Sequence, residues 1–172
     1  MQKLSFKVSE KLKYIRLIAF DFDGVFTNGL FMLSQDGTES IICNRRDSWG
    51  LNEMKRLGIK MVVINKGLDP AVSKRCQKLK LEYKYDATKD KLSILKDVLV
   101  REQVKPESVL YVGDDTIDLP CLKYAGLAVT VADGASECKK AADYITEKNG
   151  GQGAVRELCE LIVVAKGGLS RT

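Results

Sequence analysis

The sequence contains no histidine, and this absence excludes several classes of active site. Ser-His-Asp and Cys-His nucleophilic sites both need an imidazole base. Helical zinc proteases and Cys/His zinc fingers need imidazole ligands. Any general acid or base must therefore be Asp, Glu, Lys, Tyr or Cys, and any metal site must be lined by oxygen or thiolate ligands.

The chain also lacks closely spaced cysteines and long apolar runs. Its 5 cysteines are scattered, and no two of them form a Cys-x-x-Cys pair of the kind used for zinc binding or redox chemistry. Scattered thiols of this sort are typical of reduced, mostly buried cysteines in the cytoplasm. No apolar run approaches the ~20 residues of a membrane span. We therefore expect a cytoplasmic protein with no membrane partner.

Charge of one sign is not concentrated anywhere. The chain has 28 Lys+Arg against 23 Asp+Glu, a formal net charge of +5, and its lysines are spread along the sequence. Such a mild excess fits a solvated surface better than a nucleic-acid interface, so no nucleic-acid partner is expected. With 172 residues, of which 45% are hydrophobic and 30% charged, the chain fits one ordinary globular domain.

Short apolar runs alternate with helical patterns along the chain. Continuous apolar runs predict strands that are buried on both faces, at residues 15–22, 60–64, 108–112 and 127–131. Helical spacing predicts a helix that Asp47 caps and Gly58 ends, and a second that Asp69-Pro70 opens. A third is predicted from about residue 88 to 101, and a last one over residues 154–165. This alternation predicts an α/β fold, a Rossmann-like doubly wound parallel sheet. We expect one domain over residues 1–172, with its core at about 15–165.

One segment departs from the alternation. Residues 30–34 and 39–43 are apolar runs on either side of Asp36-Gly37, a pair typical of a tight hairpin turn. A β-hairpin is therefore predicted to project just after the first strand. The intervals before Asp47 and before Lys91 are too short for a second folded unit, so no cap domain is expected.

Polar residues follow three of the predicted strands where each strand ends. Asp21-Phe22-Asp23-Gly24 follows the first strand, Asn65-Lys66-Gly67 the second, and a Gly-Asp-Asp-Thr-Ile-Asp run over residues 113–118 the third. In open α/β sheets, ligands bind beyond the carboxyl ends of the strands. Lys91, at the start of a helix, is the natural fourth corner of such a site.

This residue set suits phosphoryl transfer with a hard cation. Crowded carboxylates repel one another, and a bound Mg²⁺ relieves this repulsion. The expected Mg²⁺ ligands are the side chains of Asp21 and Asp114, with the main-chain carbonyl of Asp23 as a third ligand. A carboxylate such as Asp21 can attack phosphorus, and a second carboxyl, Asp23, can protonate the leaving oxygen and then activate water. Lys91, Asn65 and backbone amides would stabilise the charge of the transferred group.

Each of these residues also has a purely structural interpretation. Isolated Asp residues at strand ends are usually turn formers or helix caps, and Asp118 or Asp47 alone would be interpreted that way. A lone Asp-x-Asp is weak as a signal. Two acidic strand ends with a lysine between them are far more specific, which favours the functional interpretation of the whole set.

With these residues in place, the sequence resembles the haloacid dehalogenase superfamily of aspartyl phosphatases. Residues 21–27 match its Asp-x-Asp-Gly-x-x-Thr motif, Lys91 its lysine motif, and residues 113–118 its acidic motif. Within this superfamily, the sequence resembles the 3-deoxy-D-manno-octulosonate 8-phosphate phosphatase subfamily. The segments that carry this resemblance are Thr27-Asn28-Gly29, the hairpin, Arg46-Asp47, Leu119-Pro120 and residues 150–157. N-acylneuraminate 9-phosphate phosphatases and the phosphatase-like domain of acylneuraminate cytidylyltransferases are similar too.

The resemblance implies a role for each acidic residue and for the oligomer. Asp21 would be the nucleophile and Asp23 the acid/base, with Asp21, Asp23 and Asp114 holding Mg²⁺ and with Asp115 and Asp118 in support. It also implies a homotetramer in which hairpins meet and a neighbour closes each open site. Phe31, Leu33 and Ile41 are candidates for that interface, or they face their own core.

Several positions depart from the subfamily and leave the substrate open. Asn65 stands where the family carries Ser or Thr, although its amide can still donate to a phosphate oxygen. Lys66-Gly67 stands where octulosonate enzymes tend to have Gly-Arg, and this pair is closer to the neuraminate-type branch. Ser48-Trp49 stands where the family often has Gly and a smaller residue, so it would narrow the substrate pocket.

The substrate class implied is a 2-keto-3-deoxy sugar acid phosphate, of the octulosonate or the neuraminate kind. Its carboxylate has four cationic candidates, with forked guanidinium donors preferred: Arg46, Lys66, Arg75 and Arg156. Arg75 and Arg156 have plain alternatives as a surface charge and as a partner of a local acid.

Two other functions remain in play from the sequence alone. One is a non-catalytic tetramerisation domain of a sugar-acid activation pathway, which the Asn65 substitution favours and the intact Asp21 and Asp23 oppose. The other is a phospho-acceptor switch, which also gathers carboxylates, a Thr and a Lys around Mg²⁺. Such switches carry the phosphorylated Asp on a later strand, whereas the acidic pair here follows the first strand.

Overall fold

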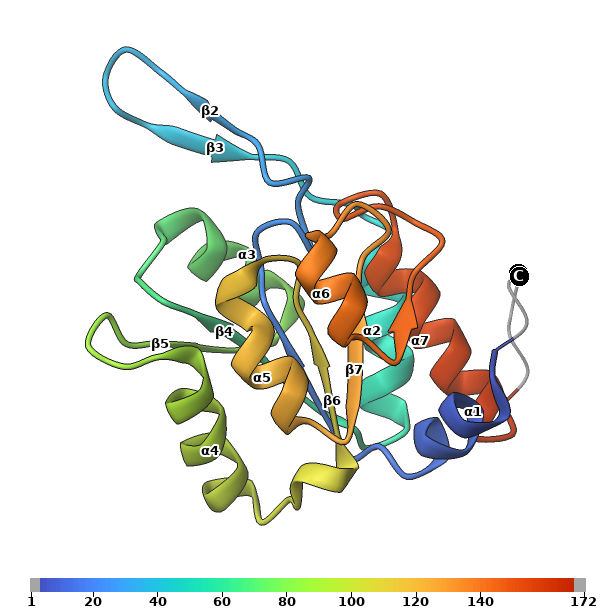
Figure 1. The fold of residues 1–172 in the computed structure, drawn as a ribbon. Coiled ribbons are helices and arrows are strands. Elements are labelled where there is room, and N and C mark those ends of the chain that lie inside the picture. Colours follow the sequence, from blue (N-terminus) through green and yellow to red (C-terminus); the bar gives the residue numbers. More distant parts are fainter. Residues whose placement is uncertain (1–3, 169–172) are drawn as a thin grey trace.

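The structure, a computed structural model, describes residues 4–168. Its centre is a parallel sheet of 6 strands in the order β5-β4-β1-β6-β7-β8 (Figure 1). The strands are β1 (Leu17–Phe20), β4 (Lys60–Asn65), β5 (Glu82–Tyr85), β6 (Val109–Val112), β7 (Leu127–Thr130) and β8 (Tyr144–Ile145). This confirms the predicted doubly wound α/β fold.

Helices cover both faces of the sheet, which is why the central strands are apolar throughout. Ile18 and Phe20 of β1 belong to a core that includes α1 (Phe6–Lys13), α2 (Asp47–Arg56), α3 (Pro70–Leu79) and α7 (Ala154–Ala165). Leu17 and Ala19 face the opposite core, with α4 (Lys91–Glu102), α5 (Leu119–Tyr124) and α6 (Ser136–Ala141). Successive side chains of one strand therefore serve two separate cores. Short 3₁₀ turns cover Pro106–Ser108 and Thr116–Asp118.

Helix boundaries follow local capping chemistry. Asp69 caps α3 by accepting from the N–H groups of Ala71 and Val72, as the Asp-Pro pair predicts. The helix expected from near residue 88 begins at Lys91, because the Asp90 side chain accepts from the Ser93 N–H. Asp47 does not cap α2 as expected: it is the first residue of that helix, and its carboxylate accepts from a backbone N–H of α7 instead.

The predicted hairpin is present and projects from the body of the protein (Figure 1). Its strands β2 (Phe31–Leu33) and β3 (Glu39–Ile41) pair antiparallel, with Phe31 opposite Ile41. Phe31 and Leu33 are exposed, whereas Ile41 packs against the main core. Among residues 4–168, no helix is long and apolar enough to cross a membrane.

Candidate active site

Three neighbouring strands bring the predicted acidic and polar residues to one edge of the sheet. β1 pairs with β4 on one side and β6 on the other, all in parallel. Asp21 follows β1 directly, Asn65 ends β4, and Gly113 follows β6. Because parallel strands share their carboxyl ends, residues far apart in sequence meet there.

Three carboxylates form a cluster at this edge, of which Asp21 and Asp118 are buried and Asp114 is half-buried. Asp21, Asp114 and Asp118 each offer one carboxylate oxygen, and these oxygens all lie within 4.8 Å of one another. Lys91 Nζ lies 2.8 Å from Asp21 Oδ1 and 2.9 Å from Asp118 Oδ1, and its side chain is buried. An oxygen-only cluster of this kind fits a hard divalent cation such as Mg²⁺.

Asp118 lies inside this cluster. The Thr116–Asp118 turn folds it back under the loop, where its carboxylate accepts from the N–H groups of Asp114, at 3.2 Å, and Asp115, at 3.4 Å. Tyr111 Oη donates to Asp118 Oδ1 over 2.8 Å. Tyr111 is a fully buried residue that sequence reasoning missed, because an apolar strand pattern gives no sign of a hydroxyl aimed at a carboxylate.

Burial and mutual repulsion shift the pKa values of the cluster. Desolvation, reinforced by the charge of Asp118, raises the pKa of Asp21 to about 8, although Lys91 opposes the shift. Desolvation and Asp118 likewise raise the pKa of Asp114 to about 6. Burial acts to lower the pKa of Lys91, but Asp21 and Asp118 outweigh it and raise that pKa. The cluster thus favours either protons or a further cation.

The loop over residues 21–27, here called the first acidic loop, is built tightly. Thr27 Oγ1 accepts from the N–H of Gly24, at 3.1 Å, and from that of Gly29, at 3.1 Å. Gly24 has φ +74°, and a Cβ there would lie 1.9 Å from Asp114 Oδ2, so only glycine fits. Asp23 is more exposed than Asp21, and desolvation together with the charge of Asp69 raises its pKa.

The loop after β4 carries the other predicted phosphate-binding residues. Asn65 Oδ1 accepts from the Lys66 N–H at 2.9 Å, so the amide nitrogen of Asn65 remains the donor. Lys66 is exposed. Tyr83 Oη donates to Gly67 O over 2.9 Å and accepts from the Asp69 N–H over 3.2 Å, which fixes the loop to β5.

The four cationic candidates differ in how free they are. Arg46 and Lys66 are exposed. Arg75 Nη2 donates to the Asn44 carbonyl over 3.0 Å, while its Nε is buried with no protein partner. Arg156 Nε donates to Glu160 over 2.6 Å, and its guanidinium lies over the Trp49 ring. Asp115, expected in a supporting role, is exposed and accepts from the Thr116 N–H.

Comparison with known proteins gives a consistent family. A model of haloacid dehalogenase-like hydrolases matches residues 84–158. The 3-deoxy-D-manno-octulosonate 8-phosphate phosphatase KdsC of Escherichia coli (strain K12) is 37% identical over 166 residues, which cover 96% of this chain and 88% of that protein.

Solved structures agree with this. The 3-deoxy-D-manno-octulosonate 8-phosphate phosphatase of Yersinia pestis superposes with a TM-score of 0.91 at 34% identity, covering 96% of this chain and 90% of its own. That of Moraxella catarrhalis, solved with a magnesium ion, a phosphate ion and a KDO molecule, gives a TM-score of 0.89 at 33% identity, covering 94% of this chain and 92% of its own. The chain belongs to the 3-deoxy-D-manno-octulosonate 8-phosphate phosphatase family of haloacid dehalogenase-like hydrolases.

Proposed function

We propose that this protein removes phosphate from 3-deoxy-D-manno-octulosonate 8-phosphate by way of an aspartyl-phosphate on Asp21, with Mg²⁺ as its cofactor. The observation that carries the proposal is the clustering of Asp21, Asp114, Asp118 and Lys91 at the carboxyl edge of the sheet. Relatives that share more than a third of their residues with this chain over most of its length carry the same activity in their names.

In the first step, a carboxylate oxygen of Asp21 attacks phosphorus and the bond from phosphorus to the sugar oxygen breaks. Asp23 donates its proton to that departing oxygen. The raised pKa of Asp23 supports this role, because desolvation and the charge of Asp69 help it to retain a proton.

In the second step, Asp23, now ionised, takes a proton from water as the water oxygen attacks phosphorus. The bond between Asp21 and phosphorus breaks and inorganic phosphate leaves. Lys91 offsets part of the charge of Asp21 before and after the transfer, and bound Mg²⁺ would supply the remaining stabilisation that a buried carboxylate needs to be ionised at neutral pH.

Charge on the phosphoryl group needs donors that are already in position. The amide nitrogen of Asn65 supplies one, in place of the hydroxyl expected at that position. Mg²⁺, held by Asp21 and Asp114 with Asp118 beside them and with the main-chain carbonyl of Asp23 as a further ligand, supplies positive charge to the phosphate oxygens.

As partners for the sugar acid carboxylate we favour the four cationic candidates described above. Arg75 has a buried Nε without a protein partner, and this donor would reach an anionic group only after the side chain turns outward. Arg46 and Lys66 are exposed and free to turn towards a substrate. Arg156 would have to exchange its contact with Glu160. The Lys66-Gly67 pair makes N-acylneuraminate 9-phosphate the second candidate substrate.

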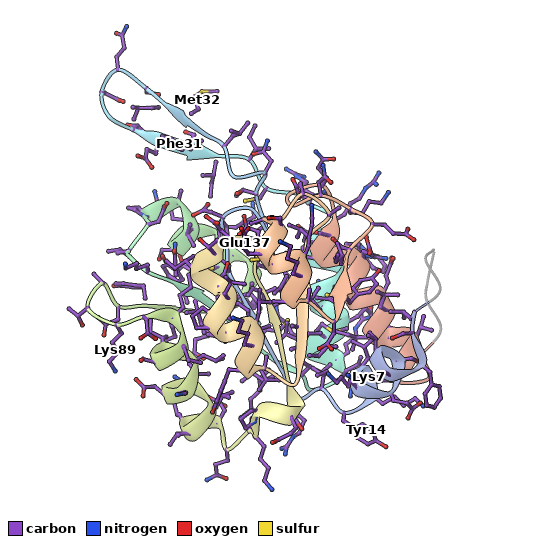
Figure 2. The ribbon with its side chains drawn as sticks, viewed as in Figure 1. Lys7, Tyr14, Phe31, Met32, Lys89 and Glu137 are labelled. Carbon is purple, nitrogen blue, oxygen red and sulfur yellow. The ribbon has the colours of Figure 1, made fainter. Side chains whose placement is uncertain are left out.

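The open site and the apolar hairpin together support a homotetramer. Leu30, Phe31, Met32 and Leu33 are 59–70% exposed. Figure 2 shows Phe31 and Met32 on the projecting hairpin, away from the body of the protein. Exposed apolar residues grouped in this way are typical of an interface.

The free cysteines, four of them buried, suit the reducing cytoplasm as the place of action.

The test is a comparison of kcat/KM for the two sugar acid phosphates, with Mg²⁺ and with a chelator. We expect octulosonate 8-phosphate to be preferred by about tenfold or more, which corresponds to at least ~1.4 kcal/mol of transition-state discrimination. A preference for the neuraminate substrate would change the substrate but keep the reaction. Folded protein without activity on either would favour the non-catalytic tetramerisation domain.

A further inference from the structure

A glycine-rich segment packs directly on the first acidic loop. This segment, residues 149–153, is called the glycine loop below. Gly151 N donates to the Val25 carbonyl over 3.0 Å. A Cβ on Gly150 would lie 1.7 Å from the Gly24 carbonyl oxygen, and one on Gly151 would lie 2.6 Å from the Thr27 carbonyl carbon. The two loops therefore touch backbone to backbone, at a distance that no side chain permits.

Gly24 lies between this contact and the acidic cluster. Its carbonyl meets Gly150, while a Cβ on its other side would meet Asp114 Oδ2 at 1.9 Å. Asp23, the proposed acid/base, is its immediate neighbour in the chain. Gly24 therefore joins the glycine loop to Asp23 and Asp114.

The glycine loop leads into α7 without a cap of its own. Gly153, the N-cap residue of α7, has φ +104° and no side chain to satisfy the first N–H groups of the helix. Asp47 of α2 supplies the missing acceptor: its Oδ1 receives the Arg156 N–H over 3.2 Å. Asp47 is only 1% exposed, and the two residues are 109 positions apart.

A second carboxylate holds the other end of the contact. Asp133, in the loop after β7, accepts from the Gly150 N–H through Oδ1 at 2.8 Å. Asp133 is exposed, so its side chain has little packing role. Glu157 of α7 accepts from the N–H groups of Glu147 and Lys148, which fixes the segment before the loop. Carboxylates from outside the glycine loop thus accept hydrogen bonds from its backbone and from the residues on either side of it.

We propose that Asp47 and Asp133 are positioning residues. Their hydrogen bonds hold the glycine loop in contact with Gly24 and thereby determine where Asp23 and Asp114 lie. Neither carboxylate touches the acidic cluster in its role: each acts through backbone N–H groups of residues 150–156. The kinetic part of this inference rests on the proposed phosphatase activity, whereas its structural part does not.

The test uses Asp47→Ala and Asp133→Ala, with Asp47→Asn as the conservative variant, since its amide oxygen still accepts the Arg156 N–H. Ser5→Ala is the matched control, because it removes a side-chain cap from α1, far along the chain from the site. Backbone hydrogen exchange of residues 24–29 is compared with that of β1. In both alanine variants we expect exchange in 24–29 to rise by about tenfold, with β1 unchanged.

Activity gives the second measurement. We expect both alanine variants to lose about tenfold or more in kcat with little change in KM, because displacement of the reacting groups affects the chemical step. Asp47→Asn should recover most of this loss, and Ser5→Ala should match the unaltered protein. If Asp47→Ala does not fold, the exposed Asp133→Ala decides the matter alone.

Unchanged exchange at residues 24–29 in Asp133→Ala would overturn the proposal, as would equal kcat losses in Asp47→Asn and Asp47→Ala. The two proposals fail differently. If the unaltered protein hydrolyses neither sugar acid phosphate, the proposed function fails, while the exchange measurement still decides whether these carboxylates position the loop.

Discussion

Asp21 carries two requirements that conflict at neutral pH. In the proposed reaction it must be ionised to attack phosphorus, yet burial and the charge of Asp118 raise its pKa to about 8 in the absence of metal. Lys91 partly stabilises the ionised form of Asp21, because its Nζ lies 2.8 Å from Asp21 Oδ1. A divalent cation supplies the remaining stabilisation, because bound metal favours the ionised carboxylates. The acidic cluster is therefore a site where protons and metal compete.

This competition predicts that Mg²⁺ binds more tightly as pH rises. Between pH 6 and pH 8, Mg²⁺ must displace a proton from Asp21, whose pKa is about 8, and near pH 6 also one from Asp114, whose pKa is about 6. Each proton released makes affinity rise by about tenfold per pH unit, with a plateau above pH 8. Calorimetry on the metal-free protein measures this. Asp97→Asn, which changes an exposed carboxylate outside the cluster, is the control, and an affinity independent of pH would contradict the account.

Lys91 is predicted to stabilise the fold as well as the reaction. It is buried between Asp21 and Asp118, so Lys91→Met leaves two carboxylates without their cation. The free energy of unfolding should fall by about 3 kcal/mol at pH 8. The fall should be smaller at pH 6, where Asp21 takes up a proton. Urea unfolding measures both values.

The neighbouring Lys89→Met is the matched control for this change. Lys89 forms an exposed ion pair with Asp97, which is worth little in water. Equal losses of stability in the two variants would show that burial of Lys91 does not matter.

At the scale of single elements, α4 places Lys91, and its start depends on one cap. The Asp90 side chain accepts from the Ser93 N–H at 2.7 Å. Asp90→Ala should lower the free energy of unfolding by about 1 kcal/mol, measured by urea denaturation. Asp97→Ala, which removes an exposed carboxylate further along the same helix, should cost much less. A larger loss in Asp97→Ala would mean that the cap does not define this helix.

Elements with strong local signals were predictable from sequence. The helix over residues 154–165 and the strands β1, β4, β6 and β7 have apolar patterns that burial on one or both sides explains. β5 was missed because Glu82–Tyr85 alternates charged and aromatic residues at a half-buried edge of the sheet. β8 spans only Tyr144–Ile145 and is defined by its pairing with β7 rather than by any pattern of its own.

The same division applies to the active site. Asp21, Asp114 and Lys91 were predictable because strand ends and helix starts bring them to one edge. The contact of Tyr111 with Asp118 and the cap that Asp47 gives α7 were not. Both join residues through the tertiary fold, and the identity of either partner alone does not reveal the other.

At the scale of the whole molecule, the projecting hairpin leaves its apolar side chains Phe31 and Leu33 59% and 62% exposed. We predict that the double change Phe31→Glu and Leu33→Glu yields a folded monomer in place of the proposed tetramer, because charges at an apolar interface stay unpaired. Sedimentation velocity measures the mass.

Val100→Glu is the control, since Val100 is an apolar residue on α4 that is 80% exposed. A tetramer that survives the double hairpin change, or that is lost in the control, would contradict the assignment of the hairpin as the interface.

The most direct test of the whole account is to trap the phosphorylated residue during turnover. The protein is mixed with Mg²⁺ and octulosonate 8-phosphate, quenched, and treated with borohydride, which reduces an acyl phosphate and turns the aspartate into homoserine. We predict that homoserine appears at position 21 and nowhere else, and that Asp21→Asn releases no phosphate. Substrate turnover without modification of Asp21, or modification at another carboxylate, would contradict the account.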